Sequence, residues 1–170
     1  MRRHKNVYTL ATGDKDLYEL LNDNSSMELY SVDFVNDANI IGQNERTISI
    51  NGFLEVGLDG EVNSEAIGTK QYSAPGGQLD FVRGVQLAKD GKSILTAYST
   101  ADKGAVSRIV AKVEGPATDP RADTQYVVTE YGVANLRGKS IAERAEALIA
   151  IAHPNFRDDL MRGARQLGYL

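Results

Sequence analysis

The residues of this 170-residue chain that could do chemistry lie mostly in loops that follow predicted strands. Glu130 comes directly after an apolar strand at 126–129, and a carboxylate at a strand end could act as an acid or a base. The same carboxylate could instead cap a neighbouring amide or pair with an arginine such as Arg137. Asn36 could donate its side-chain amide to a developing oxyanion. Asparagine is also common in turns, because its side chain bonds to nearby backbone.

Two glycine-containing loops are further candidates for binding. Gly76 and Gly77 precede Gln78, which begins a predicted helix, and a backbone without side chains can approach a ligand closely. The first N–H groups of a helix and its positive dipole end suit a thioester carbonyl, an oxyanion or a phosphate. A plain loop-to-helix turn explains the same spacing. Lys103, in the loop after a strand at 92–98, could contact a phosphate or a pantetheine carbonyl, or it could belong to a solvent-exposed turn.

The elements that must position these residues alternate between strands and helices. Asp59 and Gly60 form a dipeptide typical of a hairpin turn, and Ser140 and Glu143 form a capping box that opens a helix. Strands are predicted at 6–12, 27–32, 47–50, 53–56, 61–63, 92–98, 105–113 and 126–129, and helices at 14–21, 78–88, 140–152 and from 154 to near 168. This mixture predicts an α/β fold with a mostly parallel sheet and hairpin additions, in one domain over residues 1–170.

Composition narrows the classes of function. A net charge of −4 and a pI of about 5.2 argue against a nucleic-acid binder. The chain has no cysteine and two histidines far apart in sequence, which argues against disulfides, a thiolate nucleophile and a His-rich metal site. No apolar run approaches the roughly 18 residues of a membrane span, and the first residues do not resemble a signal peptide. We therefore expect a cytoplasmic protein without metal, nucleic-acid or membrane partners.

Several ordered motifs together resemble a known family. They read V-D-F-V-N-D at 32–37, I-N-G-F-L-E-V at 50–56, G-T-K-Q-Y-S-A-P-G-G-Q-L-D-F at 68–81, S-T-A-D-K-G at 99–104, V-V-T-E-Y-G-V-A-N-L-R-G-K-S-I-A-E-R-A at 127–145 and I-A-H-P-N-F-R at 151–157. Over nearly its whole length the chain is similar to the C-terminal domain of acetyl-CoA hydrolases and of 4-hydroxybutyrate, succinate and related CoA-transferases.

The resemblance implies a CoA-transferase-like three-layer α/β domain and a covalent reaction. In this family a glutamate attacks an acyl-CoA, and coenzyme A passes onto that glutamate as an enzyme thioester. A small carboxylate of the acetate, butyrate or 4-hydroxybutyrate class then takes the coenzyme A, whereas water takes that place in a hydrolase. Coenzyme A and its acyl thioesters are therefore the expected substrates, and no metal is implied.

The resemblance also implies roles for the candidate residues. Asn36 and the backbone of Gly77 would lie beside the reacting carbonyl, and the loop at 76–78 would face the thioester end of coenzyme A. Lys103 falls where the family contacts coenzyme A. Glu130 matches a second active-site glutamate that orients groups and tunes charge, and it does not match the nucleophile.

One departure from the family pattern affects the expected activity. The family's nucleophilic glutamate lies upstream, in an H-[ST]-E-M-like segment before a stretch that G-D-K-D-L-Y-E-L at 13–20 matches, and these 170 residues contain no such segment. Ala74 and Pro75 also stand where the family more often has glycine and an aliphatic residue. We expect the N-terminal domain to be absent and the chain to be incomplete alone, with a separate N-terminal half as a partner.

Three alternatives remain open at this point. The chain could be an acetyl-CoA hydrolase, a self-contained thioesterase with Glu130 as its base, or a non-catalytic remnant that keeps only the fold, with or without coenzyme A binding. A truncated sheet edge would also favour a homo-oligomer.

Overall fold

The central sheet has four strands, and three of them are parallel. In the computed structural model, which describes residues 4–170, its order is β13–β12–β8–β3. The strands are β3 (Ile48–Gly52), β8 (Lys92–Thr96), β12 (Tyr126–Thr129) and β13 (Gly132–Asn135). β8 pairs in parallel with both β3 and β12, and β13 adds an antiparallel edge.

Shorter strands surround this sheet. β11 (Ile109–Val110) pairs in parallel with β4 (Glu55–Gly57), which pairs antiparallel with β5 (Val62–Asn63). Two hairpins complete the body, namely β6–β7 and β9–β10. Their strands are β6 (Ala66–Ile67), β7 (Lys70–Gln71), β9 (Thr100–Ala101) and β10 (Val106–Ser107).

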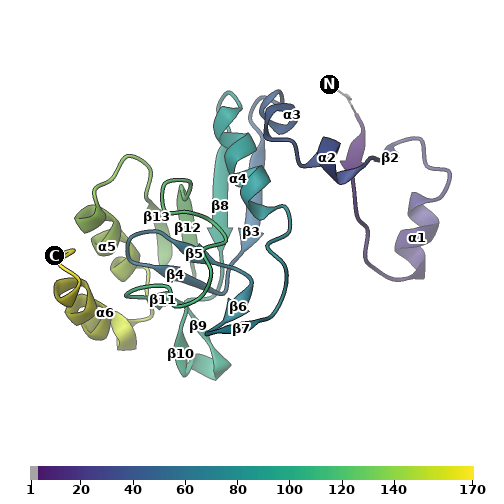
Figure 1. Cartoon of the computed structure of the whole chain (residues 1–170). Coiled ribbons are helices and arrows are strands. Elements are labelled where there is room, and N and C mark those ends of the chain that lie inside the picture. Colours follow the sequence, from purple (N-terminus) through teal and green to yellow (C-terminus); the bar gives the residue numbers. More distant parts are fainter. Residues whose placement is uncertain (1–3) are drawn as a thin grey trace.

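Helices cover the sheet and enclose the core. α4 (Gln78–Leu87) packs on β3, β8 and α3 (Ala38–Gly42), while α5 (Ile141–Ala150) packs on β13 and on α6 (Pro154–Gln166), as Figure 1 shows. The core joins these layers through fully buried side chains that include Val56, Leu58, Leu95, Ile109, Leu136 and Leu148. None of the helices in residues 4–170 is long and apolar enough to cross a membrane.

The first part of the described chain stands apart from this body. It contains β1 (Asn6–Tyr8), α1 (Lys15–Leu21), β2 (Met27–Leu29) and α2 (Val32–Val35), and β1 and β2 pair in parallel with each other. Figure 1 shows this segment extending away from the central sheet, connected to it by the chain that enters α3.

Most of the predicted elements are confirmed, and the errors have local causes. The helix at 78–88, the capping box and the Asp59-Gly60 hairpin are present. The single strand predicted at 105–113 is wrong, because the chain leaves the β9–β10 hairpin near Arg108 and pairs next with β4. The strand predicted at 6–12 ends at Tyr8. β13 and the β6–β7 hairpin were not predicted, since these short segments carry no clear apolar alternation.

Candidate functional site

The candidate residues lie around the edge where the parallel strands end. β3, β8 and β12 run in the same direction, so that Gly52, Thr96 and Thr129 end at one edge of the sheet. α4 precedes β8 in the chain and packs back along it, so its first turn lies at this same edge (Figure 1). Open α/β sheets bind ligands outside the carboxyl ends of their strands, and this edge is therefore the candidate active site.

Asn36 and Gly77 are in direct contact although they are far apart in sequence. Asn36 is the C-cap of α2, and its side-chain amide nitrogen lies only 2.1 Å from the position that a Cβ on Gly77 would occupy. The same nitrogen donates to Asp80 Oδ2 at 3.4 Å. Any side chain on Gly77 would therefore collide with Asn36. The structure thus places a side-chain amide donor beside the first turn of α4, and an amide donor is one of the groups that can stabilise an oxyanion.

The loop before α4 has an open backbone and a firmly attached first residue. Gly76 has a φ of +59°, and a Cβ there would meet nothing within 4 Å. The side chain of Gln78 donates to Ser64 Oγ at 2.8 Å and to Asp119 Oδ2 at 2.7 Å. The Gln78 side chain thus ties the start of α4 to neighbouring loops, and the Gln78 backbone N–H, in the first turn, has no partner inside the helix.

Asp119 makes this attachment unusually dependent on Gln78. The Asp119 side chain is fully buried, and one of its oxygens, Oδ1, has no hydrogen-bond partner in the described part of the chain. Burial raises the pKa of Asp119, and the hydrogen bond from Gln78 opposes that rise. The amide of Gln78 is therefore a structural support for the loop at 76–78.

Ser99 holds Glu130 in place at the strand ends. The Ser99 backbone N–H donates to Glu130 Oε2 and the Ser99 hydroxyl donates to Oε1, each at 2.7 Å. Partial desolvation acts to raise the pKa of Glu130, but the two bonds from Ser99, with a smaller effect of His153, lower it below its usual value. Glu130 is thus an oriented, ionised carboxylate. Arg137, which was an alternative partner, makes no ion pair with Glu130 among the described residues.

Tyr131, the residue after Glu130, forms a cluster with aromatic and basic side chains of the start of α6. The Tyr131 ring meets the His153 ring edge-on at 5.5 Å, and the Arg157 guanidinium lies over the Tyr131 ring at 5.7 Å. His153 also caps α6 by accepting from the Asn155 N–H at 3.2 Å. These contacts fix the start of α6 beside the strand end that carries Glu130.

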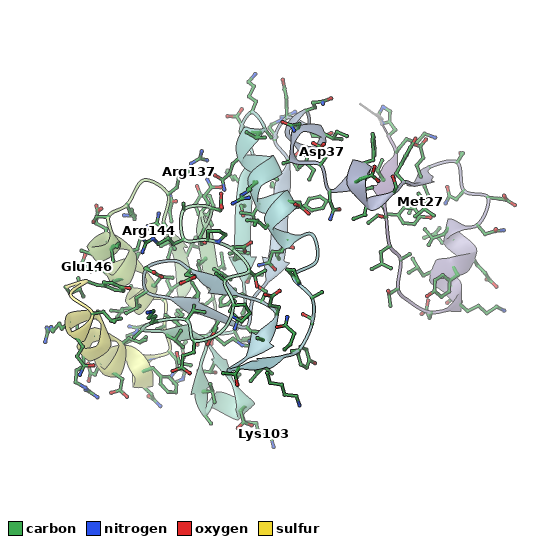
Figure 2. The ribbon with its side chains drawn as sticks, viewed as in Figure 1. Met27, Asp37, Lys103, Arg137, Arg144 and Glu146 are labelled. Atoms are coloured by element: carbon green, nitrogen blue, oxygen red, sulfur yellow. The ribbon has the colours of Figure 1, made fainter. Side chains whose placement is uncertain are left out.

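Lys103 belongs to a different part of this edge. It lies in the tight turn Asp102–Gly104 between β9 and β10, with a φ of +55°, and its side chain is exposed. Figure 2 shows Lys103 at the tip of this hairpin, pointing away from the body. Lys103 is thus free to reach a ligand that extends past the hairpin. In residues 4–170 no group of three or more acidic or histidine side chains is arranged to hold a metal ion.

The structure therefore brings two predicted residues together and pairs a third with a residue that was not predicted. Asn36 meets Gly77, and Glu130 meets Ser99, while Lys103 stays apart on its hairpin. Ser99 was part of a motif but was not predicted as a site residue. Its position directly after β8, beside the end of β12, is the signal that could have identified it.

Comparison with known proteins defines the class to which this fold and site belong. Residues 13–164 match the family described as the acetyl-CoA hydrolase/transferase C-terminal domain. The chain belongs to this family, as its motifs predicted.

Individual relatives agree with this assignment. The 4-hydroxybutyrate coenzyme A transferase of Clostridium kluyveri is 51% identical over 159 residues, which are 92% of this chain and 37% of the relative. The crystal structure of RipA from Yersinia pestis superposes with a TM-score of 0.95 at 49% identity, over 99% of this chain and 38% of that one. A 4-hydroxybutyrate CoA-transferase structure from Porphyromonas gingivalis gives a TM-score of 0.79 at 43% identity, over 96% and 38%.

These comparisons confirm the predicted α/β fold class as that of solved CoA-transferases. The chain spans less than two fifths of the length of these relatives.

Proposed function

We propose that this chain forms the coenzyme A-facing part of a CoA-transferase, which moves coenzyme A between an acyl-CoA and a small carboxylic acid. The observation that carries the proposal is the contact between Asn36 and Gly77 at the first turn of α4. It offers an amide donor and free backbone N–H groups at one point, where a thioester carbonyl would develop negative charge.

The roles of the other residues follow from this placement. Glu130 is held ionised by Ser99, so it serves to orient groups and balance charge, and a proton-accepting role in thioester hydrolysis is disfavoured by its lowered pKa. Lys103 would meet the phosphates or the pantetheine arm of coenzyme A. The glutamate that forms the thioester would come from another part of a longer polypeptide, because no H-[ST]-E-M-like segment lies in these residues.

A full-length chimera tests the proposal. The matched region of the Clostridium kluyveri relative is replaced by this chain, and the chimera is given acetyl-CoA and 4-hydroxybutyrate. We expect 4-hydroxybutyryl-CoA to form, and we expect the matched variant Gly77→Val to lose this activity, because its side chain would occupy the place of the Asn36 amide.

The two alternatives give different products in the same assay. Release of free coenzyme A without any acceptor carboxylate would identify a hydrolase, which the family description also includes. A folded chimera that neither transfers nor hydrolyses would identify a non-catalytic remnant, whether or not it binds coenzyme A. Calorimetric titration of the unmodified 170-residue chain with coenzyme A separates loss of binding from loss of chemistry.

A further inference from the structure

The hairpin that carries Lys103 depends on its root for its orientation. β9 and β10 pair only with each other, so no other strand in the described part of the chain holds this hairpin against the body. A two-stranded hairpin alone is marginally stable at best. Figure 2 shows Lys103 at its outer tip. The direction in which Lys103 points is therefore set where the two strands join the body, at Ser99 and Arg108.

Ser99 and Arg108 face each other at this root. The hairpin register pairs Ser107 with Thr100, and the Arg108 N–H then donates to Ser99 O at 2.9 Å. Ser99 is fully buried, and both its N–H and its hydroxyl donate to the Glu130 carboxylate. One backbone hydrogen bond thus separates Arg108 from the residue that holds Glu130.

The Arg108 side chain ties the root to a second segment. Its Nη1 donates to Leu54 O at 3.0 Å and to Phe53 O at 3.2 Å, in the connection between β3 and β4. The Arg108 carbonyl also accepts from the Val56 N–H at 2.8 Å, where the pairing of β11 with β4 begins. Backbone carbonyls withdrawn from water need a donor, and one guanidinium serves two of them here. Arg108 therefore links the hairpin root to the carboxyl end of β3.

This arginine has no carboxylate partner. It is half-buried, and no acidic side chain within residues 4–170 forms an ion pair with it. Arginine is seldom withdrawn from water without an ion pair, because desolvation of its charge costs free energy. Departures of this kind from the ordinary pairing rule are typical of functional sites. The two carbonyls are the contacts that hold the guanidinium in place.

We propose that Arg108 is a positioning residue of the candidate active site, which holds the root of the β9–β10 hairpin and, through Ser99, the orientation of the Glu130 carboxylate. Arg108 itself takes no part in the reaction. Because Lys103 lies on the same hairpin, Arg108 also sets the direction in which Lys103 reaches. The importance of these positions for coenzyme A rests on the proposed function, whereas the contacts themselves lie within the chain.

Electrostatics separates this role from a simple effect of charge. Partial desolvation acts to raise the pKa of Glu130, whereas the bonds from Ser99 and a smaller effect of His153 lower it overall. Arg108 is not among the groups that shift this pKa. Loss of the Arg108 charge alone should therefore leave the pKa of Glu130 where it is. A rise of that pKa in an Arg108 variant would report that Ser99 has moved.

Arg144 provides a matched control. It is also half-buried, and its Nη1 also donates to two backbone carbonyls, those of Asp59 and Arg121. Figure 2 shows Arg144 beside α5, well away from Lys103 and its hairpin. Replacement of either arginine by methionine keeps an apolar stem and removes the donors. The two variants thus lose the same kind of contact, but only one of them loses it at the candidate site.

Carboxyl NMR of the free 170-residue chain tests the proposal, with the Glu130 signal assigned by its loss in Glu130→Gln. We expect both Arg108→Met and Arg144→Met to lower the Tm, because each leaves two carbonyls without a donor. Only Arg108→Met should raise the pKa of Glu130 toward its usual value and weaken coenzyme A binding, by about tenfold in calorimetry. Arg108→Lys, which keeps the charge on a shorter side chain, should raise the same pKa by less, and it replaces Arg108→Met if that variant does not fold.

Two results would overturn the proposal. An unchanged pKa of Glu130 in both Arg108 variants would do so, even if the variants were less stable than the parent. An equal rise in Arg144→Met would do so as well, because it would show a general loosening of the fold.

The proposed function fails in a different way. If the parent chain and the full-length chimera do not bind coenzyme A while the pKa of Glu130 still responds to Arg108, the positioning role stands and the function is wrong. If the parent binds coenzyme A and no Arg108 variant changes either quantity, the function stands and the positioning role is wrong.

Discussion

Gly77 and Gly76 offer a matched pair of substitutions that separates a collision in the site from backbone strain. Gly77→Ala places a Cβ 2.1 Å from Asn36 Nδ2 and 3.0 Å from Asn36 Cγ, at an ordinary φ of −97°. Gly76→Ala meets no atom within 4 Å, but it puts alanine at a φ of +59°. One variant therefore displaces Asn36, and the other strains only the loop.

The expected changes in the free energy of unfolding are similar in size. In Gly77→Ala the Asn36 side chain must rotate and give up its long bond to Asp80, and the helix loses its glycine cap, for a total of about 1 kcal/mol. In Gly76→Ala the left-handed backbone costs about 1–2 kcal/mol. Urea unfolding of each variant measures these values.

Coenzyme A binding should separate the two variants. We expect Gly77→Ala to weaken binding by about tenfold or more, which is about 1.4 kcal/mol, and Gly76→Ala to weaken it much less. In an Asn36→Ala background the collision is gone, so Gly77→Ala should cost less stability there than in the parent. Calorimetry and the double-mutant cycle test both points. Equal loss of binding in the two single variants, or an equal cost of Gly77→Ala in both backgrounds, would refute the reasoning.

Three other predictions follow from single contacts. Ser99→Ala removes a hydrogen bond to the exposed carboxylate of Glu130 and should lower the free energy of unfolding by about 1 kcal/mol. Because the folded-state pKa of Glu130 is lowered, this difference should be present above about pH 4.5 and vanish as the pH falls through that pKa, which urea unfolding at both ends of the range checks. Gly84→Ala puts a Cβ 2.6 Å from Ile41 Cβ, and the overpacking should outweigh the gain in helix propensity, with a net loss of about 1–2 kcal/mol in urea unfolding. Lys103→Gly relieves a φ of +55° and should leave the Tm nearly unchanged while weakening coenzyme A binding roughly threefold in calorimetry; unchanged binding would remove Lys103 from the site.

The sequence by itself determined the features that local chemistry controls. Ser140 and Glu143 form the predicted capping box, because a cap needs only residues within one helical turn. Gly60 adopts the positive φ that its hairpin requires, and α4 begins at Gln78 directly after the glycine pair. The ordered motifs also identified the family, which the match over residues 13–164 confirms.

Only the tertiary structure decided which residues meet. Asn36 reaches Asp80 across 44 positions, Gln78 reaches Asp119 across 41, and Ser99 reaches Glu130 across 31. These contacts depend on the crossover of α4 and on the register of β8 against β12, and both are set by burial of side chains from many segments at once. For the same reason the sequence alone did not show that the segment containing β1, α1 and β2 lies outside the main core. Its strands and helix have ordinary local signals, and their lack of buried surface is visible only when the whole chain is folded.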